Sequence, residues 1–231
     1  MTRDRFDPAG GGRRCLLFDL GNVLIDFDHG VVSRTLARHA TGDHPAPAEA
    51  IHEYIFGGSG AASPNAGIDR GTGSIEALHA EVAARFSLAV SLDEFRRAWS
   101  SIFADDLNRA VADRLTQASA RFDVRICSNT NETHWSGLRS KHPLLDALDG
   151  NQQCLLSFRI GKIKTDPGFF QHVATVTGLP ASDHLLIDDR HDNCQAAEAA
   201  GMRALQFRAG ERGSAARIDD ALRRSGWLAG G

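Results

Sequence analysis

The chain has 231 residues, of which 42% are hydrophobic and 24% are charged, and its formal net charge is −3 at pH 7. This composition is ordinary for a globular protein and excludes the disordered, collagen-like and coiled-coil classes. The small negative charge argues against a nucleic-acid partner, and no run approaches the roughly 20 apolar residues of a membrane span. The first residues lack an apolar signal region, so we expect a cytoplasmic protein without a membrane partner.

Five short apolar runs have the length and composition of buried strands in a parallel sheet. They cover residues 15–18, 122–127, 154–158, 185–187 and 204–207. Leu107, Val111 and Leu115 recur at helical spacing between two of these runs. Asp166-Pro167 is typical of a helix start, and Gly201 is typical of a helix end. Strands that alternate with helices predict an α/β fold with a doubly wound parallel sheet.

Residues 29–103 interrupt this alternation, because they show helical periodicity and no convincing strand. Ser91-Leu-Asp-Glu94 is a capping box that predicts a helix with Phe95, Trp99, Ile102 and Phe103 on one face. The glycine-rich segment 57–67 predicts a flexible loop. We therefore expect a core formed by residues 14–28 and 104–231, an inserted helical cap at 29–103 and a loose tail at 1–13.

Polar side chains follow or flank the predicted strands, at the edge of the sheet where open α/β folds bind ligands. They occur in Asp19-Leu-Gly-Asn22, Ser128-Asn-Thr130, Lys164-Thr-Asp-Pro167 and Asp188-Asp189. Carboxylate oxygens suit Mg²⁺, and a hydroxyl and a lysine suit a phosphoryl group. A carboxylate can also be the nucleophile, as in enzymes that form an aspartyl phosphate. The combination outlines a phosphoryl-transfer site.

Each of these segments also has a purely structural interpretation. Asp19 could merely end a strand, and Ser128 or Thr130 could cap a helix before Glu132. Asp188-Asp189 could cap the helix that begins near Arg190, and Lys164 could be a solvated surface lysine. The shared position at one edge of the sheet favours the functional interpretation of the set.

The four segments together resemble the ordered motifs of the haloacid dehalogenase-like (HAD) hydrolases. The matching residues are Phe18-Asp-Leu-Gly-Asn-Val-Leu-Ile-Asp26, Ser128-Asn-Thr-Asn131, Lys164-Thr-Asp-Pro167 and Ile187-Asp-Asp189. The resemblance covers residues 14–208, and the first two motifs are similar to the capped sugar-phosphate phosphatase branch, which includes alpha-D-glucose-1-phosphate phosphatase. It implies a Rossmann-like core and a helical cap that closes over the substrate.

The resemblance further implies a Mg²⁺-dependent phosphatase that acts on small phosphorylated metabolites, with sugar phosphates as one candidate class. Asp19 would then attack phosphorus and be phosphorylated transiently. Ser128 and Asn129 would hold the phosphoryl oxygens, and Lys164 would neutralise the charge shared by the nucleophile and the phosphate. The implied metal ligands are Asp19, the carbonyl of Gly21, Asp188 and Asp189.

The chain departs from the family at Gly21, where most of these phosphatases carry a second aspartate. That aspartate protonates the leaving group and then activates water. Asp26 is our candidate substitute acid or base, and further candidates are Asp28, His29 and Asp69. The glycine is also compatible with a leaving group that needs little help, or with slow or absent turnover.

Two other functions remain as alternatives. One is a non-catalytic protein that binds phosphate or a phosphorylated metabolite, which Gly21 favours. The other is a 2-haloacid dehalogenase, in which the aspartate attacks carbon. Dehalogenases of this family need no magnesium, so the pair Asp188-Asp189 argues against that function.

Overall fold

The computed structural model describes residues 13–41, 46–57, 62–208 and 214–228. Its centre is a five-stranded sheet in the order β5-β4-β1-β6-β7, and every neighbouring pair of strands is parallel. The strands are β1 (Cys15–Phe18), β4 (Asp123–Ser128), β5 (Cys154–Leu156), β6 (His184–Asp188) and β7 (Arg203–Gln206). The predicted α/β fold with a doubly wound parallel sheet is therefore confirmed. The chain moves outward from β1 to one edge and then to the other, which places the ligand-binding crevice at the carboxyl end of β1.

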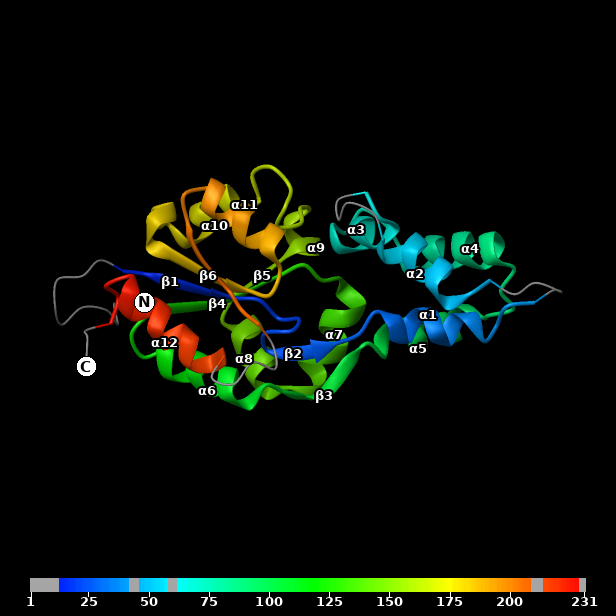
Figure 1. Cartoon of the computed structure of the whole chain (residues 1–231), viewed down its shortest axis with the longest axis horizontal. Coiled ribbons are helices and arrows are strands. Elements are labelled where there is room, and N and C mark those ends of the chain that lie inside the picture. The colour runs from blue at the N-terminus through cyan, green and yellow to red at the C-terminus, as the bar shows by residue number, and fades with distance from the viewer. Residues whose placement is uncertain (1–12, 42–45, 58–61, 209–213, 229–231) are drawn as a thin grey trace.

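Helices cover both faces of this sheet (Figure 1). One face packs against α6 (Arg109–Ala118), α7 (Glu132–Lys141), α8 (Pro143–Gly150) and α12 (Ser214–Arg224). The other packs against α10 (Phe169–Thr177) and α11 (His191–Ala199). Successive side chains of a strand point to opposite faces, so Leu16 and Phe18 belong to the first core and Cys15 and Leu17 to the second. Both faces of the strands are thus buried, which explains their continuous apolar runs.

Five further helices lie between β1 and β4 in the chain order. They pack around a separate apolar core of their own. These cap helices are α1 (Gly30–Ala37), α2 (Ala48–Phe56), α3 (Pro64–Asp69), α4 (Ile75–Phe86) and α5 (Leu92–Ser100). An antiparallel ribbon of β2 (Ile25–Phe27) and β3 (Phe103–Leu107) joins them to the sheet. In Figure 1 the cap helices lie together at one end of the molecule, away from the two termini.

Three local predictions in and beside the cap region need correction. Phe103 does not extend α5 but opens β3, where it pairs with Phe27, and Leu107 ends that strand instead of belonging to α6. The segment 57–67 is not a loop throughout, because the Ser63 side chain accepts the Ala66 N–H and Pro64 occupies the first turn of α3. The capping box is confirmed, since Ser91 and Glu94 exchange both bonds at the start of α5.

Two further predictions in the sheet region need correction. The run 154–158 is a strand only as far as Leu156, because Ser157–Ile160 forms the short helix α9. Asp166 does not cap α10, which starts at Phe169 after Gly168 with a φ of 85°. The predicted tail at 1–13 falls outside the described residues except for Arg13, and so does part of the predicted loop, residues 58–61. Among the helices that are described, none has the length and apolar character to cross a membrane.

Candidate active site

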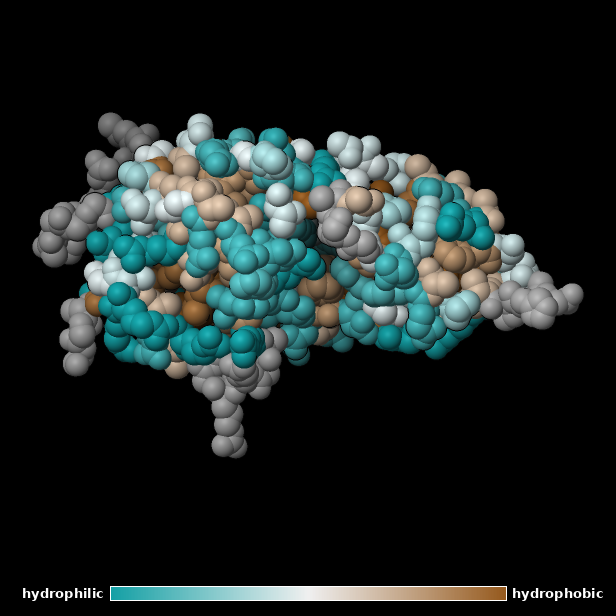
Figure 2. Space-filling view, turned by 45° about the horizontal axis from the view of Figure 1, so that its top comes forward, coloured by the Kyte–Doolittle hydropathy of each residue, from teal (hydrophilic) through white to brown (hydrophobic). Residues whose placement is uncertain are grey.

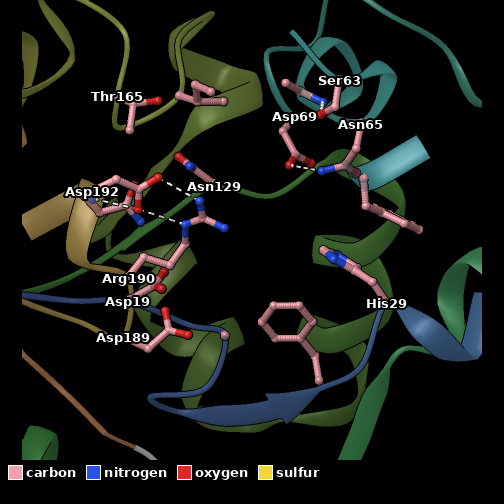
Figure 3. A pocket seen from close by; sticks show the side chains of 16 residues that line it. Asp19, His29, Ser63, Asn65, Asp69, Asn129, Thr165, Asp189, Arg190 and Asp192 are labelled. Atoms are coloured by element: carbon pink, nitrogen blue, oxygen red, sulfur yellow. Dashed lines mark hydrogen bonds and ion pairs between the residues drawn. The ribbon is translucent and has the colours of Figure 1, made fainter. Parts of the chain in front are cut away.

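A cavity of about 150 Å³ opens between the carboxyl ends of the strands and the cap helices. The surface is hollowed at this place in Figure 2. Figure 3 shows Asp19 and Asp189 on one side of the cavity and Ser63, Asn65 and Asp69 of the cap region on the other. The site is therefore assembled from two parts of the molecule, each with its own apolar core.

A fully buried lysine joins two of the predicted carboxylates. Lys164 Nζ donates hydrogen bonds to Asp19 Oδ1 at 2.8 Å and to Asp188 Oδ2 at 2.5 Å. Burial by itself lowers the pKa of the lysine, but the two carboxylates outweigh it and raise that pKa well above its usual value. Lys164 is thus a buried positive charge bonded to two carboxylates and not a solvated surface lysine.

Three carboxylates converge beside this lysine. Oxygen atoms of Asp19, Asp188 and Asp189 lie within 4.8 Å of one another. The parallel pairing of β1 with β6 produces this arrangement, since it brings the strand ends together and Asp19 N–H donates to the Ile187 carbonyl at 2.9 Å. Burial raises the pKa of Asp19 to about 7, against the opposing effect of Lys164, and burial also raises the pKa of Asp189.

The composition of this cluster fits a hard divalent cation. Three carboxylates face a single lysine, so negative charge is in excess when all of them are ionised. Carboxylate and carbonyl oxygens are the ligands that Mg²⁺ and Ca²⁺ prefer. Gly21, the fourth predicted ligand, lines the same cavity.

Side-chain amides that the sequence analysis did not single out orient the carboxylates. Asn22 Nδ2 donates to Asp189 Oδ2 at 3.0 Å, and Asn193 Nδ2 donates to Asp188 Oδ1 at 2.9 Å. Asn22 has a φ of 54°, a left-handed conformation that asparagine tolerates better than most residues. The place of Asn22 inside the first motif could have indicated a role in the site. For Asn193 the sequence offers only its position shortly after the Asp188-Asp189 pair.

Ser128 is buried at the end of β4. β4 and β6 flank β1 in the sheet, so Ser128 and Asp188 lie on opposite sides of the end of β1. Neither Ser128 nor Thr130 caps α7, because the Asn131 side chain accepts the His134 N–H there. Asn129 lines the cavity, and its Oδ1 accepts the backbone N–H of Lys164 at 2.8 Å. The structure therefore connects the second motif directly to the loop that carries the lysine.

The candidate substitutes for the missing second aspartate are placed very differently. Asp26 is exposed on β2, where its neighbour Phe27 lines the cavity and Asp26 itself does not. Asp28 is exposed too and accepts bonds from Arg34 and the Gly30 N–H. Adjacent side chains of a strand point to opposite faces, which explains why Phe27 lines the cavity and Asp26 does not. The structure does not bring Asp26 into the site.

The other two candidates, His29 and Asp69, both line the cavity. His29 stacks on Phe56 with ring centroids 4.1 Å apart, and burial lowers the pKa of its imidazole to about 3. Asp69 is buried at the end of α3, where Asn65 Nδ2 donates to it at 2.9 Å and Asn131 Nδ2 at 3.1 Å. Burial raises the pKa of Asp69 to about 6, so this carboxyl group can change its protonation state near neutral pH.

Arg70, which follows the cap helix α3, makes a two-pronged contact with Asp166 in the loop that carries Lys164. Arg70 Nε and Nη2 donate to Asp166 Oδ2 and Oδ1, each at 2.6 Å, and the Asp166 side chain also accepts the Ile163 N–H. The pairing with Arg70 lowers the pKa of Asp166, so the pair stays ionised at neutral pH. The contact fastens the end of α3 beside Lys164.

Arg70→Lys is expected to loosen this contact, because lysine keeps the charge but cannot reproduce the fork. We expect amide hydrogen exchange in α3 to become roughly 10-fold faster, since a bond to a charged group stabilises by about 1.5–3 kcal/mol. Mass spectrometry of peptides that cover residues 64–69 measures the change, with Arg97→Lys on the exposed face of α5 as the matched control. Equal exchange in the two variants would contradict a fastening role for Arg70.

Several solved structures share this fold, although no protein-family model matches the chain. The HAD family enzyme BT-2542 of Bacteroides thetaiotaomicron, in complex with magnesium and inorganic phosphate, aligns with a TM-score of 0.71 at 23% identity over 87% of this chain and 96% of its own. A predicted HAD-like family hydrolase of Porphyromonas gingivalis aligns with a TM-score of 0.73 at 21% identity, covering 91% and 98%.

Dehalogenases share the fold more distantly. The L-2-haloacid dehalogenase of Xanthobacter autotrophicus, with chloropropionic acid covalently bound, aligns with a TM-score of 0.59 at 16% identity over 91% of this chain and 83% of its own. The likeness therefore extends across enzymes that carry out different reactions, and reaction type has to be argued from the site. The chain has the fold of the HAD family.

Proposed function

We propose that the protein is a Mg²⁺-dependent phosphatase of small phosphorylated metabolites that forms an aspartyl phosphate at Asp19. The observation that carries the proposal is the buried Lys164 bonded to Asp19 and Asp188 next to Asp189. A buried charge cluster of this kind is costly unless it binds something, and perturbed carboxylates in a cavity are typical of functional sites. The magnesium and phosphate in the BT-2542 structure support the same assignment.

In the proposed reaction an Asp19 oxygen attacks phosphorus while Lys164 holds the nucleophile in position. Ser128 and Asn129 orient the phosphoryl oxygens, and the lysine offsets the negative charge that nucleophile and phosphate share. Asp19, the Gly21 carbonyl, Asp188 and Asp189 would hold Mg²⁺, whose charge lets two anions approach each other. Phosphoryl transfer depends mainly on such positioning and charge neutralisation, because its transition state is largely metaphosphate-like.

The cavity wall beyond these groups favours a small polar leaving group such as a sugar. Ser63, Asn65 and Asp69 contribute polar side chains there, and Phe27 and Phe56 contribute apolar rings. Aromatic faces beside hydrogen-bonding groups suit the mixed surface of a sugar ring. In this proposal residues 29–103 form the specificity-determining cap over a catalytic core of 14–28 and 104–231. The proposed substrates are of the kind used by the sugar-phosphate branch that contains alpha-D-glucose-1-phosphate phosphatase.

Phosphate release from sugar phosphates, other phosphorylated metabolites and 4-nitrophenyl phosphate, each with Mg²⁺ and with EDTA, tests the proposal. We expect release with Mg²⁺ and a loss of at least about 10²-fold with EDTA, because metal removal leaves the excess carboxylate charge unbalanced. Halide release from 2-haloacids that persists in EDTA would assign a dehalogenase. Absence of both activities in folded protein, together with phosphate binding, would assign a binding protein.

A further inference from the structure

The ring of Phe27 occupies the space into which a Cβ at position 21 would project. A Cβ atom built on Gly21 would lie 2.5 Å from Cε1 and 2.7 Å from Cδ1 of Phe27, which is far closer than real contacts allow. The ribbon of β2 and β3 fixes this ring, because Phe27 pairs with Phe103 and packs against it with ring centroids 6.2 Å apart. An aspartate two residues after the nucleophile would therefore require the Phe27 ring to shift. Because position 21 carries no side chain, any acid or base has to come from elsewhere.

A small cavity of about 40 Å³ lies next to the Phe27 ring, and Asp69 lines it together with Gly21, Ser128 and Asn129. This volume is enough for one or two water molecules. Asp69 also lines the larger cavity that contains Asp19 (Figure 3). Asp69 thus borders both the space around the nucleophile and the space beside Gly21.

Asp69 is held rigidly although it belongs to the cap. Asn131, at the start of α7 in the sheet-containing part, donates from Nδ2 to Asp69 Oδ1 in the cap. The Asn131 side chain is itself held in place, because its Oδ1 accepts the His134 N–H and its Nδ2 lies 3.0 Å from His134 Nδ1. Asn65 donates to the other carboxylate oxygen from within α3. Two amide donors fix the plane of the carboxyl group, which is what a proton-transferring group requires.

We propose that Asp69, supplied by the cap, is the general acid and base of this phosphatase in place of the aspartate that Gly21 lacks. The inference rests on the proposed function. In the first half-reaction Asp19 forms a bond to phosphorus, the bond from phosphorus to the ester oxygen breaks, and that oxygen takes the proton of Asp69. In the second, a water oxygen attacks phosphorus, its proton passes to Asp69, and the bond from phosphorus to Asp19 breaks.

The charged and titratable groups around Asp69 are compatible with this role. On its own helix end Arg70 is already paired with Asp166. On α7 burial lowers the pKa of His134 to about 4, and across the cavity burial lowers that of His29 to about 3, so both rings are neutral near pH 6. The raised pKa of Asp69, about 6, leaves a substantial protonated fraction where the enzyme would work.

Asp69→Asn tests the inference through its dependence on the leaving group, measured in the presence of saturating Mg²⁺. For sugar and glycerol phosphates, whose alkoxides need a proton, we expect kcat/KM to fall by about 10²–10³-fold. For 4-nitrophenyl phosphate we expect a fall of less than about 10-fold, because 4-nitrophenolate leaves unaided. We also expect a burst of 4-nitrophenol equal to the enzyme concentration, since hydrolysis of the aspartyl phosphate loses its base.

The pH dependence gives a second readout. A general acid acts in its protonated form, so wild-type kcat/KM for a sugar phosphate should fall as the pH rises through about 6. The ionisation of the substrate affects both proteins equally, so it cancels in the ratio of the wild-type kcat/KM to that of Asp69→Asn. We expect this ratio to decrease with rising pH, and formate to restore activity to Asp69→Ala. A merely structural role predicts a constant ratio and no rescue.

Asp93→Asn, the same substitution on the exposed start of α5, is the matched control. Equal losses for sugar and 4-nitrophenyl phosphates in Asp69→Asn, or no loss, would overturn the inference while leaving the phosphatase intact. A selective loss of sugar-phosphate hydrolysis in Asp26→Asn, with 4-nitrophenyl phosphate spared, would assign the role to that exposed carboxylate instead. If the wild type releases no phosphate from any ester, the proposed function fails, and the inference fails with it.

Discussion

Asp19→Asn is expected to abolish phosphate release, with kcat/KM at least about 10³-fold below that of the wild type. Asparagine has nearly the same shape, but its amide oxygen is a poor nucleophile, so the covalent route is closed. The fold should survive, because the substitution removes one of three crowded carboxylates and leaves Lys164 paired with Asp188. A loss of activity in a folded variant would therefore report chemistry and not stability.

Quenching the reaction in acid and measuring the mass of the peptide that contains Asp19 provides the direct check. The wild type should show a phosphorylated fraction during turnover, and Asp19→Asn should show none. Asp113→Asn, which changes an exposed carboxylate on α6, should behave as the wild type does. Near wild-type turnover by Asp19→Asn, or phosphate attached to another residue, would refute Asp19 as the nucleophile.

Lys164→Met is expected to produce the second large effect, on stability as well as on activity. Removing one partner of a buried ion pair lowers the free energy of unfolding by about 3–5 kcal/mol. The Lys164 side chain has no exposed surface and is shared by two carboxylates. In activity we expect a loss of at least about 10²-fold in kcat/KM at saturating Mg²⁺, the usual cost of removing one electrostatic stabiliser. Urea unfolding and steady-state kinetics measure the two effects.

The stability loss should depend on pH in the metal-free protein. Asp19 has a pKa of about 7 in the folded state and an ordinary aspartate has one of about 4, so the native state binds more protons in between. A raised carboxyl pKa makes stability fall as the pH rises from about 4 to 7. Without Lys164 the folded-state pKa of Asp19 rises further, so in Lys164→Met the fall should continue to higher pH and be larger in total. Mg²⁺ should reduce it.

Lys141→Met is the matched control for this experiment, because Lys141 is exposed at the end of α7. Its free energy of unfolding should change by less than about 0.5 kcal/mol and should show no added pH dependence. An identical pH profile for Lys164→Met and the wild type would mean that the lysine does not compensate the carboxylates. A failure of Mg²⁺ to stabilise either protein would contradict a divalent cation site at the cluster.

The parallel sheet could be predicted from the sequence because its strands are buried on both faces and appear as continuous apolar runs. β3 could not, since Phe103–Leu107 contains two adjacent acids and is stabilised by pairing with β2 rather than by burial. The cap helix α3 is only six residues long, and its start depends on Ser63 and Pro64 inside a glycine-rich stretch. Such short elements lack the repeated periodicity that reveals long helices.

The same reasoning applies to the candidate site. The sheet topology brings Asp19 and the Asp188-Asp189 pair to one edge, so their proximity was predictable once the strands were recognised. The bond from Asn131 to Asp69 spans 62 residues between two separately packed parts of the chain. No local pattern signals such a contact, and the sequence analysis accordingly named Asp69 only among the further candidates beside Asp26.

The overlap between Phe27 and any side chain at position 21 makes the two positions interdependent over evolutionary time. An aspartate at position 21 requires the Phe27 ring to shift or a smaller residue to replace it, because a Cβ alone would lie 2.5 Å from the ring. Replacing Phe27 first would remove the ring contact with Phe103 without any gain in return. Each single step is therefore unfavourable, so this packing opposes the gain of an aspartate at position 21 by single substitutions.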